Sequence, residues 1–256
     1  MQTTSYTKEF YDEQAPASYR SAVLFSRHLW TLTQPQSVVD FGCGKGTWLK
    51  AFKQLGAQRL TGYDGPWISQ EMMADRAIRL IRTDLNEPIE CDERFDLAIS
   101  LEVAEHLRQE TADIFVRSLT DASDLVLFGA AVPGQGGTDH INEQLPSYWA
   151  TKFISLGYQP FDIFRLAFWK NSSVKFWYRQ NTFLYARTTS SIFTEFLQGG
   201  YMALPNIAFM DCIHPELHEL TILRGRTGHK IRNIVRPFFP TAMLKAIARW
   251  REKKHS

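Results

Sequence analysis

Val38-Val39-Asp40-Phe41-Gly42-Cys43-Gly44-Lys45-Gly46 is the stretch of this 256-residue chain that decides its fold. An apolar strand ends in an acid, glycines follow at alternate positions, and a helical pattern begins at Thr47. Glycine permits a positive φ and lets a ligand lie against bare backbone, and free N–H groups at a helix start point toward that ligand. We therefore expect a small-molecule site at the carboxyl end of the first parallel strand of an open α/β sheet.

The spacing of these glycines excludes two nucleotide-binding motifs. A P-loop requires Ser or Thr after its Gly-Lys pair, whereas Lys45 is followed by Gly46. In the dinucleotide fingerprint Gly-x-Gly-x-x-Gly, the third glycine comes one residue later than it does here. The pattern Asp-x-Gly-x-Gly-x-Gly instead resembles motif I of the class I S-adenosylmethionine (SAM) methyltransferases. This resemblance implies a Rossmann-like α/β fold, a seven-stranded sheet with helices on both faces, with SAM as the cofactor.

Acids also follow the next two predicted strands, residues 59–63 and 77–81. Asp64, after the second strand, can accept hydrogen bonds from both ribose hydroxyls of a nucleoside. In the resembling family an acid at the position of Asp84 accepts from the adenine amino group, with Leu85 beside the ring. For any one acid the alternative is a helix N-cap or a solvated loop. The expected cofactor-binding residues are Asp40, Gly42, Gly44, Gly46, Asp64, Asp84, Leu85 and, on the fourth predicted strand, Ser100.

A second group of polar residues, Ser-Leu-Glu-Val-Ala-Glu-His-Leu, follows the predicted fourth strand at residues 100–107. On a helix, Glu102, Glu105 and His106 would share one face. Two carboxylates and an imidazole around one point can bind a divalent metal, and carboxylates favour Mg²⁺ or Mn²⁺. His140 is a fourth candidate ligand, because its loop follows the fifth predicted strand and fourth and fifth strands are neighbours in a doubly wound sheet.

The Glu-x-x-Glu-His segment with the later histidine resembles the metal site of small-RNA 3′-end methyltransferases, and its first part is similar to the ubiquinone-pathway O-methyltransferases. In those families the metal holds the vicinal hydroxyls of the substrate and lowers the pKa of the attacking oxygen. The resemblance implies Glu102, Glu105, His106 and His140 as metal ligands, with Glu102, His106 and His140 as the catalytic residues. A metal-free histidine base and a purely structural role remain the alternatives.

The chain divides in sequence into a helical leader (1–36), a methyltransferase domain (37–187) and a C-terminal extension (188–256). Tyr11, Tyr19 and Arg20 of the leader are candidates for a lid over the cofactor, and core packing is the alternative for both tyrosines. No apolar run approaches the length of about 18 residues that indicates a transmembrane helix. The N-terminus lacks the features of a signal peptide, and three scattered cysteines predict no disulfide framework. We therefore expect a cytoplasmic protein.

Aromatic and planar polar side chains gather in residues 146–187, where we expect a strand over 161–169 and a last strand over 182–186. Aromatic faces stack on sugars or bases, and Arg, Gln and Asn bind hydroxyls or carboxylates. The arrangement is similar to bacterial methyltransferases associated with surface-polysaccharide synthesis, which implies a saccharide acceptor. Packing behind the sheet is the alternative. The candidate contacts are Arg165, Trp169, Trp177, Tyr178, Arg179, Gln180 and Asn181.

The tail from Thr221 to Ser256 contains ten Lys/Arg and one acid, a net charge of +9 that leaves −7 for the rest of the chain. Met243, Ile247 and Trp250 recur at helical spacing, which predicts an amphipathic helix with a basic face. Three partners for that helix are considered: an anionic lipid surface at the inner face of the membrane, nucleic acid, or the rest of this chain.

These patterns predict an enzyme, a SAM-dependent O-methyltransferase acting on a hydroxyl of a surface glycan or a sugar precursor. The main alternative is an RNA 3′-end 2′-O-methyltransferase, which would have the same fold but a different acceptor. Against it, residues 36–140 contain no basic patch interleaved with aromatics. A non-catalytic SAM-fold protein that binds a partner through its tail is a third hypothesis, and the intact Asp64 and Asp84 argue against it. The methylated position, the metal, the oligomeric state and the role of residues 188–220 are not predicted.

Overall fold

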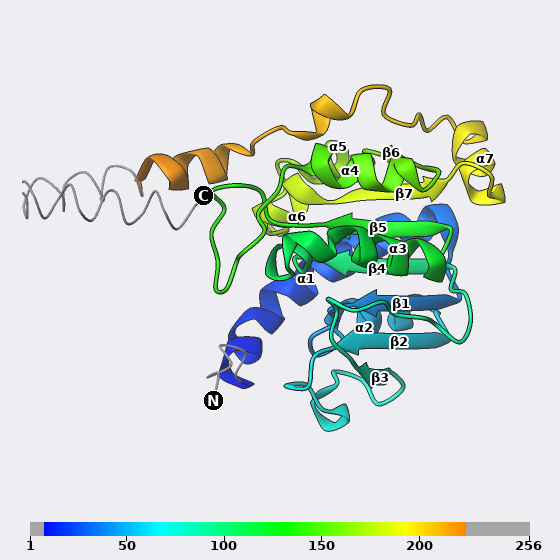
Figure 1. Cartoon of the computed structure of the whole chain (residues 1–256), viewed down its shortest axis with the longest axis vertical. Helices are drawn as coiled ribbons and strands as arrows, with labels where there is room; N and C mark the ends of the chain where they lie inside the picture. Colours follow the sequence, from blue (N-terminus) through cyan, green and yellow to red (C-terminus); the bar gives the residue numbers. More distant parts are fainter. Residues whose placement is uncertain (1–7, 224–256) are drawn as a thin grey trace, which may run out of the picture. The chain divides into compact units, whose positions relative to one another are not determined.

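Within the part of the chain that the structure describes, seven strands form one sheet in the order β3-β2-β1-β4-β5-β7-β6 (Figure 1). The structure is a computed structural model that describes the backbone of residues 8–223 and the side chains of residues 18–223. Strands β1 to β5 are parallel, whereas β7 runs antiparallel to both β5 and β6. The strands are β1 (Ser37–Phe41), β2 (Arg59–Asp64), β3 (Arg79–Arg82), β4 (Leu97–Leu101), β5 (Leu125–Gly129), β6 (Tyr158–Phe161) and β7 (Phe183–Arg187).

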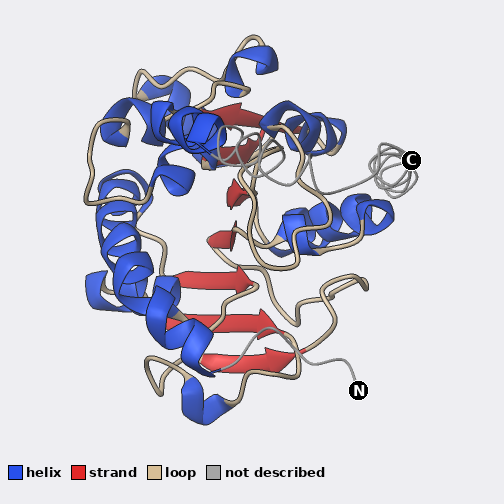
Figure 2. Cartoon of the chain, turned by 90° about the vertical axis from the view of Figure 1, so that its left-hand side faces the viewer, coloured by secondary structure: helices blue, strands red, loops and turns tan. Residues whose placement is uncertain are grey.

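Helices lie on both sides of this sheet (Figure 2). The α-helices are α1 (Lys8–Thr33), α2 (Thr47–Leu55), α3 (Ala112–Ala122), α4 (Pro146–Ser155), α5 (Phe164–Phe168), α6 (Phe176–Asn181) and α7 (Ser191–Gln198). Residues 8–223 also contain four 3₁₀ helices, η1 (Gln70–Met72), η2 (Ala104–His106), η3 (Gln109–Thr111) and η4 (Ile207–Met210). Among the helices described, none combines the length and apolar character needed to cross a membrane. The sheet and its two helical layers confirm the predicted fold class.

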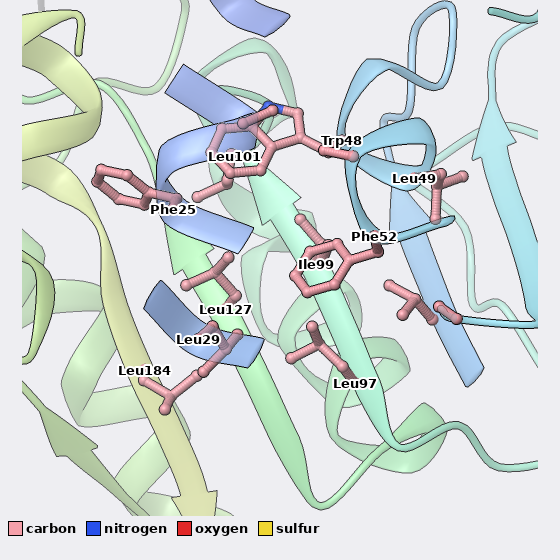
Figure 3. Close-up of a cluster of buried hydrophobic side chains, with 14 of the residues drawn as sticks. Phe25, Leu29, Trp48, Leu49, Phe52, Leu97, Ile99, Leu101, Leu127 and Leu184 are labelled. Carbon is pink, nitrogen blue, oxygen red and sulfur yellow. The ribbon is translucent and has the colours of Figure 1, made fainter. Parts of the chain in front are cut away.

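Successive side chains along the buried strands point to opposite faces of the sheet, so the interior is divided into two hydrophobic cores. In β4, Leu97 and Ile99 pack with α1 and α2, whereas Ala98 faces α3 and α4. Figure 3 shows the first core, where Phe25 and Leu29 of α1 lie beside the β4 and β5 side chains. Each fully buried Phe or Leu contributes about 1.5–3 kcal/mol relative to exposure. Because the strands are buried on both faces, their ends and not their faces are left for a site.

The expected strand over residues 161–169 is wrong beyond Phe161, where β6 ends. The chain turns into α5, because Asp162 accepts hydrogen bonds from the Arg165 backbone N–H (3.3 Å) and from its Nε (2.6 Å). These local bonds stabilise a helix start in an apolar segment whose composition suits a strand equally well. The aromatic segment before β7 is likewise helical, as α6.

Glu102, Glu105 and His106 do not lie on one helix, since β4 continues to Leu101 and only the short η2 follows. Glu102 has a φ of 58°, a left-handed conformation that stops a helix from starting there. Its N–H donates to the Gly129 carbonyl at the end of β5 (2.8 Å), so pairing with the neighbouring strand overrides the local helical pattern.

The chain forms two compact units, Met1–Cys212 and Ile213–Ser256. The first contains the sheet and all the elements named above, and the described part of the second is helical over residues 215–223. The boundaries expected at residues 36 and 187 stay predictions. The predicted basic helix around Met243, Ile247 and Trp250 lies outside the described residues.

Candidate functional site

The loop between β1 and α2 takes the conformation that its glycines permit. Gly42, Gly44 and Gly46 have φ values of 87°, 52° and 73°. A Cβ on Gly42 would lie 2.3 Å from Val103 Cγ2, and one on Gly46 would lie 2.7 Å from Ile78 Cδ1. Two of these positions therefore exclude a side chain both by backbone conformation and by contact. The loop lies at the carboxyl end of β1, where Gly42 and Gly44 are half-buried.

Asp64, at the end of β2, is tied directly to this loop. Its carboxylate accepts hydrogen bonds from the backbone N–H groups of Gly44 and Gly65, each at 2.7 Å. Burial nevertheless raises the pKa of Asp64 above its usual range, and these two amides and the Trp67 side chain oppose that shift. Asp40 is also buried, and burial together with the charge of Asp64 raises its pKa well above the usual value. The two predicted acids thus share one desolvated edge of the sheet.

Asp84 lies beyond β3 in a more exposed loop. It accepts hydrogen bonds from the backbone and side-chain nitrogens of Asn86, both at 2.9 Å, and these bonds lower its pKa. The Asn86 side-chain oxygen in turn accepts from the Arg108 backbone N–H (2.9 Å), which follows η2. Leu85 is buried beside Asp84, and Ser100 is buried in β4 with no hydrogen-bond partner for its hydroxyl among the described residues.

Glu105, His106 and His140 form a cluster in which one ligand atom of each lies within 4.8 Å of the others. Glu105 is fully buried, and neither carboxylate oxygen has a hydrogen-bond partner among the described residues. Burial and the charge of Glu102 raise the pKa of Glu105 well above its usual value. Burial, then the charge of His140, lower the pKa of His106 to about 4. Because a buried, unpaired carboxylate is costly, this set of donors fits a divalent cation.

Glu102 does not belong to this group of ligand atoms. Its two carboxylate oxygens accept hydrogen bonds from Gln135 Nε2 (2.6 Å) and Asn181 Nδ2 (3.0 Å). Asn181 Nδ2 also donates to the Gln135 side-chain oxygen (2.9 Å), which closes a three-residue network. Burial raises the pKa of Glu102 to about 7, against the opposing effect of the two amides. Glu102 is therefore held beside the cluster by two side-chain amides.

The lid role expected for Tyr11, Tyr19 and Arg20 stays a prediction. The Tyr19 hydroxyl donates to Gln54 of α2 (2.7 Å), Arg20 is exposed, and the Tyr11 side chain lies outside the described residues. Among the candidate substrate contacts, Arg165 donates to the Met210 and Phe209 carbonyls of η4 (3.0 and 2.9 Å). Those bonds indicate that Arg165 fixes the fold.

Sequence reasoning missed Gln135 and Glu143 as site residues, and it gave Asn181 a different role. Gln135 and Glu143 lie in the polar loop after β5, on either side of His140. Gln135 and Glu143 have polar side chains and lie close in sequence to glycines and to His140, the candidate metal ligand. This closeness was a signal that their side chains position His140. The Asn181 contact joins residues 79 positions apart in the chain, and no local pattern indicates it.

Residues 11–119 match the family model described as a methyltransferase domain. Two similar crystal structures are a candidate O-methyltransferase from Nostoc punctiforme PCC 73102, with 14% identity and a TM-score of 0.52, and an O-methyltransferase family protein from Burkholderia thailandensis, with 13% and 0.51. The matches cover 69% and 71% of this chain but only 58% and 59% of those proteins, less than two thirds of either. Among curated proteins, no sequence matches the chain.

These structural likenesses show the fold, and the family match covers the glycine loop, Asp64, Asp84 and the segment of Glu105. The sheet order has the antiparallel β7 inserted between β5 and β6, with the glycine loop at the carboxyl end of β1. Residues 11–119 are therefore similar to a methyltransferase domain, and the fold is that of the two O-methyltransferase structures.

Proposed function

We propose that this protein transfers the methyl group of SAM to a hydroxyl oxygen of a saccharide. The observation that carries the proposal is the cluster of Glu105, His106 and His140 at the carboxyl ends of β4 and β5, next to the glycine loop. Gly42 of that loop approaches Val103, which lies between Glu102 and the cluster, so the two parts of the site adjoin. A methyl donor and a hydroxyl acceptor held there would be neighbours.

The glycine loop and the acids suit SAM as a cofactor. Gly44 is half-buried and carries no side chain, and the Asp64 carboxylate retains lone pairs for ribose hydroxyls beside its two amide bonds. Asp84 and Leu85 supply an acceptor and an apolar surface on the next loop. When bound, SAM supplies an already activated methyl group, so the chain has to position the reactants and exclude water. The proposed set also includes Asp40, Gly46 and Ser100.

The cluster fits a divalent cation through Glu105, His106 and His140. Two imidazoles with one carboxylate suit Mn²⁺ better than Mg²⁺, which prefers an all-oxygen set. A bound cation would lower the pKa of a coordinated hydroxyl. Glu102, hydrogen-bonded to Gln135 and Asn181, stands beside this set as a proton acceptor and not as a fourth ligand.

Two side chains of the protein are candidates to accept the proton of the attacking hydroxyl. His106 has a pKa lowered to about 4, so its imidazole is neutral at pH 7 and can act only as a weak base. Glu102 has a pKa raised to about 7 and exchanges protons in the same range. Either group makes the attacking oxygen a better nucleophile for an in-line displacement at the methyl carbon.

Three features support a saccharide as the acceptor. The charge of Glu102 contributes to raising the pKa of Tyr178 to about 12, after the larger effect of burial, which places the phenol near the network. Tyr178 contacts Trp48 edge-on (5.2 Å between ring centroids) and Trp177 (6.0 Å). Trp48 and Tyr178 are buried in the first core, whereas Trp177 is partly exposed and offers an aromatic face of the kind that stacks on sugar rings. The net charge of −7 outside the tail disfavours a polyanionic acceptor such as RNA.

The acceptor is tested by methyl transfer from labelled SAM to two pools, a cell-envelope glycan extract and short RNA. Label in glycan that resists nuclease supports a sugar O-methyltransferase. Label in RNA moves the protein to the alternative, a 2′-O-methyltransferase of RNA 3′ ends. If neither pool is labelled and calorimetry detects no SAM binding, the non-catalytic hypothesis gains support.

We also propose that the basic tail directs the protein to anionic lipid at the cytoplasmic face of the membrane, where lipid-linked glycans would be its substrates. The support is the net charge of +9 in residues 221–256. Sedimentation of the full chain with vesicles tests this. Binding that requires anionic lipid and weakens in high salt is expected, and equal binding to neutral vesicles would contradict it.

A further inference from the structure

The Glu143 carboxylate closes the loop that carries His140. One oxygen, Oε2, accepts from the Gly134 backbone N–H (2.8 Å), and the other, Oε1, accepts from the Gly136 backbone N–H (2.7 Å). Oε1 also lies 2.8 Å from Nδ1 of His140. Glu143 therefore accepts two backbone bonds from the start of the loop and holds the imidazole near its end.

This contact decides which ring nitrogen of His140 carries the proton. A carboxylate accepts hydrogen bonds and does not donate them, so the 2.8 Å contact requires a proton on Nδ1. In a neutral imidazole the lone pair is then on Nε2. That nitrogen lies 4.0 Å from Glu105 Oε1, on the side of the cluster. The tautomer that Glu143 selects is the one that offers a lone pair to a cation.

The His140 ring is also confined on its Nε2 side. A Cβ on Gly137 would lie 2.2 Å from Nε2 of His140. Because Gly137 has no side chain, the imidazole ring can occupy this space. The His106 ring meets the His140 ring edge-on, with 4.7 Å between centroids. Asn142 N–H and Ile141 N–H both donate to the Glu105 carbonyl at 2.9 Å and fix the loop against η2.

We propose that Glu143 is a positioning residue that holds His140 as its Nδ1–H tautomer and directs Nε2 toward a divalent cation shared with Glu105 and His106. The inference deepens the proposed function and rests on its metal site. Carboxylates in this position raise the basicity of a ligating imidazole and fix its orientation, and removing them typically weakens metal binding by about 10- to 100-fold.

Glu143→Gln is the informative variant, because it keeps the size of the side chain and exchanges one acceptor oxygen for an NH₂ donor. If the remaining oxygen stays with the glycine amides, the NH₂ group faces Nδ1 of His140. The imidazole would then accept at Nδ1 and carry its proton on Nε2, which removes the lone pair from the cluster. Glu90→Gln, an exposed position on another loop, is the matched control.

The experiment reads the tautomer directly from the ¹⁵N and ¹H correlations of the imidazole in metal-free protein, and Mn²⁺ affinity by titration of the full chain. We expect Nδ1–H for His140 in the wild type and in Glu90→Gln. In Glu143→Gln we expect Nε2–H and Mn²⁺ binding weakened by about 10- to 100-fold. Nε2–H in the wild type would overturn the inference without any variant. So would a Glu143→Gln protein with the wild-type tautomer and Mn²⁺ affinity.

Failure of the metal site itself gives a different result. If the wild type shows Nδ1–H on His140 and binds no Mn²⁺, the cation is removed from both proposals. The orientation of His140 by Glu143 then stands as the support of a histidine base. A folded state is checked by circular dichroism for each variant.

Discussion

The two halves of the site are held in different ways. At the ends of β2 and β3, Asp64 and Asp84 accept hydrogen bonds from amides of their own and neighbouring loops. At the ends of β4 and β5, the buried Glu105 carboxyl lies 4.0 Å from Nε2 of His140, and Glu102 depends on amides 33 and 79 positions away. The first half offers carboxylate acceptors that suit the hydroxyls of a nucleoside. The second half buries a carboxyl whose pKa is raised well above its usual value beside two imidazoles, and this set of donors suits a cation.

The largest effect that separates the two halves is expected from Asp64→Ala. Its carboxylate holds Gly44 and, in our proposal, two ribose hydroxyls. Since hydrogen bonds to charged groups contribute about 1.5–3 kcal/mol each, SAM should bind at least about 100-fold more weakly. Calorimetric titration measures this, with Asp75→Ala, which removes a surface acid paired with Lys53, as the control. Normal SAM affinity in Asp64→Ala would show that the role assigned to β2 is wrong.

The opposite pattern is expected from His140→Ala. The change removes a cluster ligand and leaves the glycine loop untouched, so SAM should bind as it does to the wild type. Methyl transfer should fall at least about 100-fold, as for the loss of a group that activates the nucleophile. Ile141→Ala, an exposed neighbour in the same loop, controls for disturbance of the loop. If His140→Ala loses SAM binding as well, the two halves do not act separately.

Gly42→Ala should affect both halves together, because Gly42 contacts Val103 of the second half. The new Cβ would lie 2.3 Å from Val103 Cγ2 at a φ of 87°. We expect a loss of about 1–3 kcal/mol in the free energy of unfolding, with weaker SAM binding and slower transfer. Gly134→Ala separates the causes, because Gly134 has a φ of 88° and a Cβ added there would meet no atom within 4 Å. Equal losses in both variants would exclude the Val103 contact as a cause.

The smallest effect concerns the pH dependence of stability in the second half. The pKa of His106 is about 4 in the folded chain and about 6.5 when unfolded, so the unfolded state binds more protons between these values. His106 should therefore destabilise the fold as pH falls from about 6.5 toward 4, by up to about 3 kcal/mol. In metal-free protein, chemical denaturation of His106→Gln should show a shallower loss of stability over this range. An unchanged slope would mean that burial does not keep His106 neutral.

Sequence reasoning succeeded where the determinants are local. The glycine loop and the strand ends at Asp64 and Asp84 follow from residues that are close in the chain. Each acid is positioned by amides of its own loop or of the adjacent one, so a short motif contains most of the information.

The second half could be predicted only in part. The sequence indicates Glu105, His106 and His140, but the helix expected to align Glu102 with them is absent from the described residues, because Glu102 pairs with Gly129 of the neighbouring strand. The network of Glu102 with Gln135 and Asn181 forms only after β4, β5 and α6 have come together. Long-range side-chain contacts of this kind leave no period or spacing in the sequence.

The proposed cation site of Glu105, His106 and His140 is tested most directly by asking whether methyl transfer requires a metal. The full chain is stripped with EDTA, and transfer from labelled SAM to a cell-envelope glycan extract is measured before and after Mn²⁺ is restored, with SAM affinity measured in parallel. We expect transfer to fall at least about 100-fold without metal and to recover with Mn²⁺, while SAM affinity is unchanged. Transfer that ignores the chelator would contradict the metal site and leave His106, His140 or Glu102 as the base.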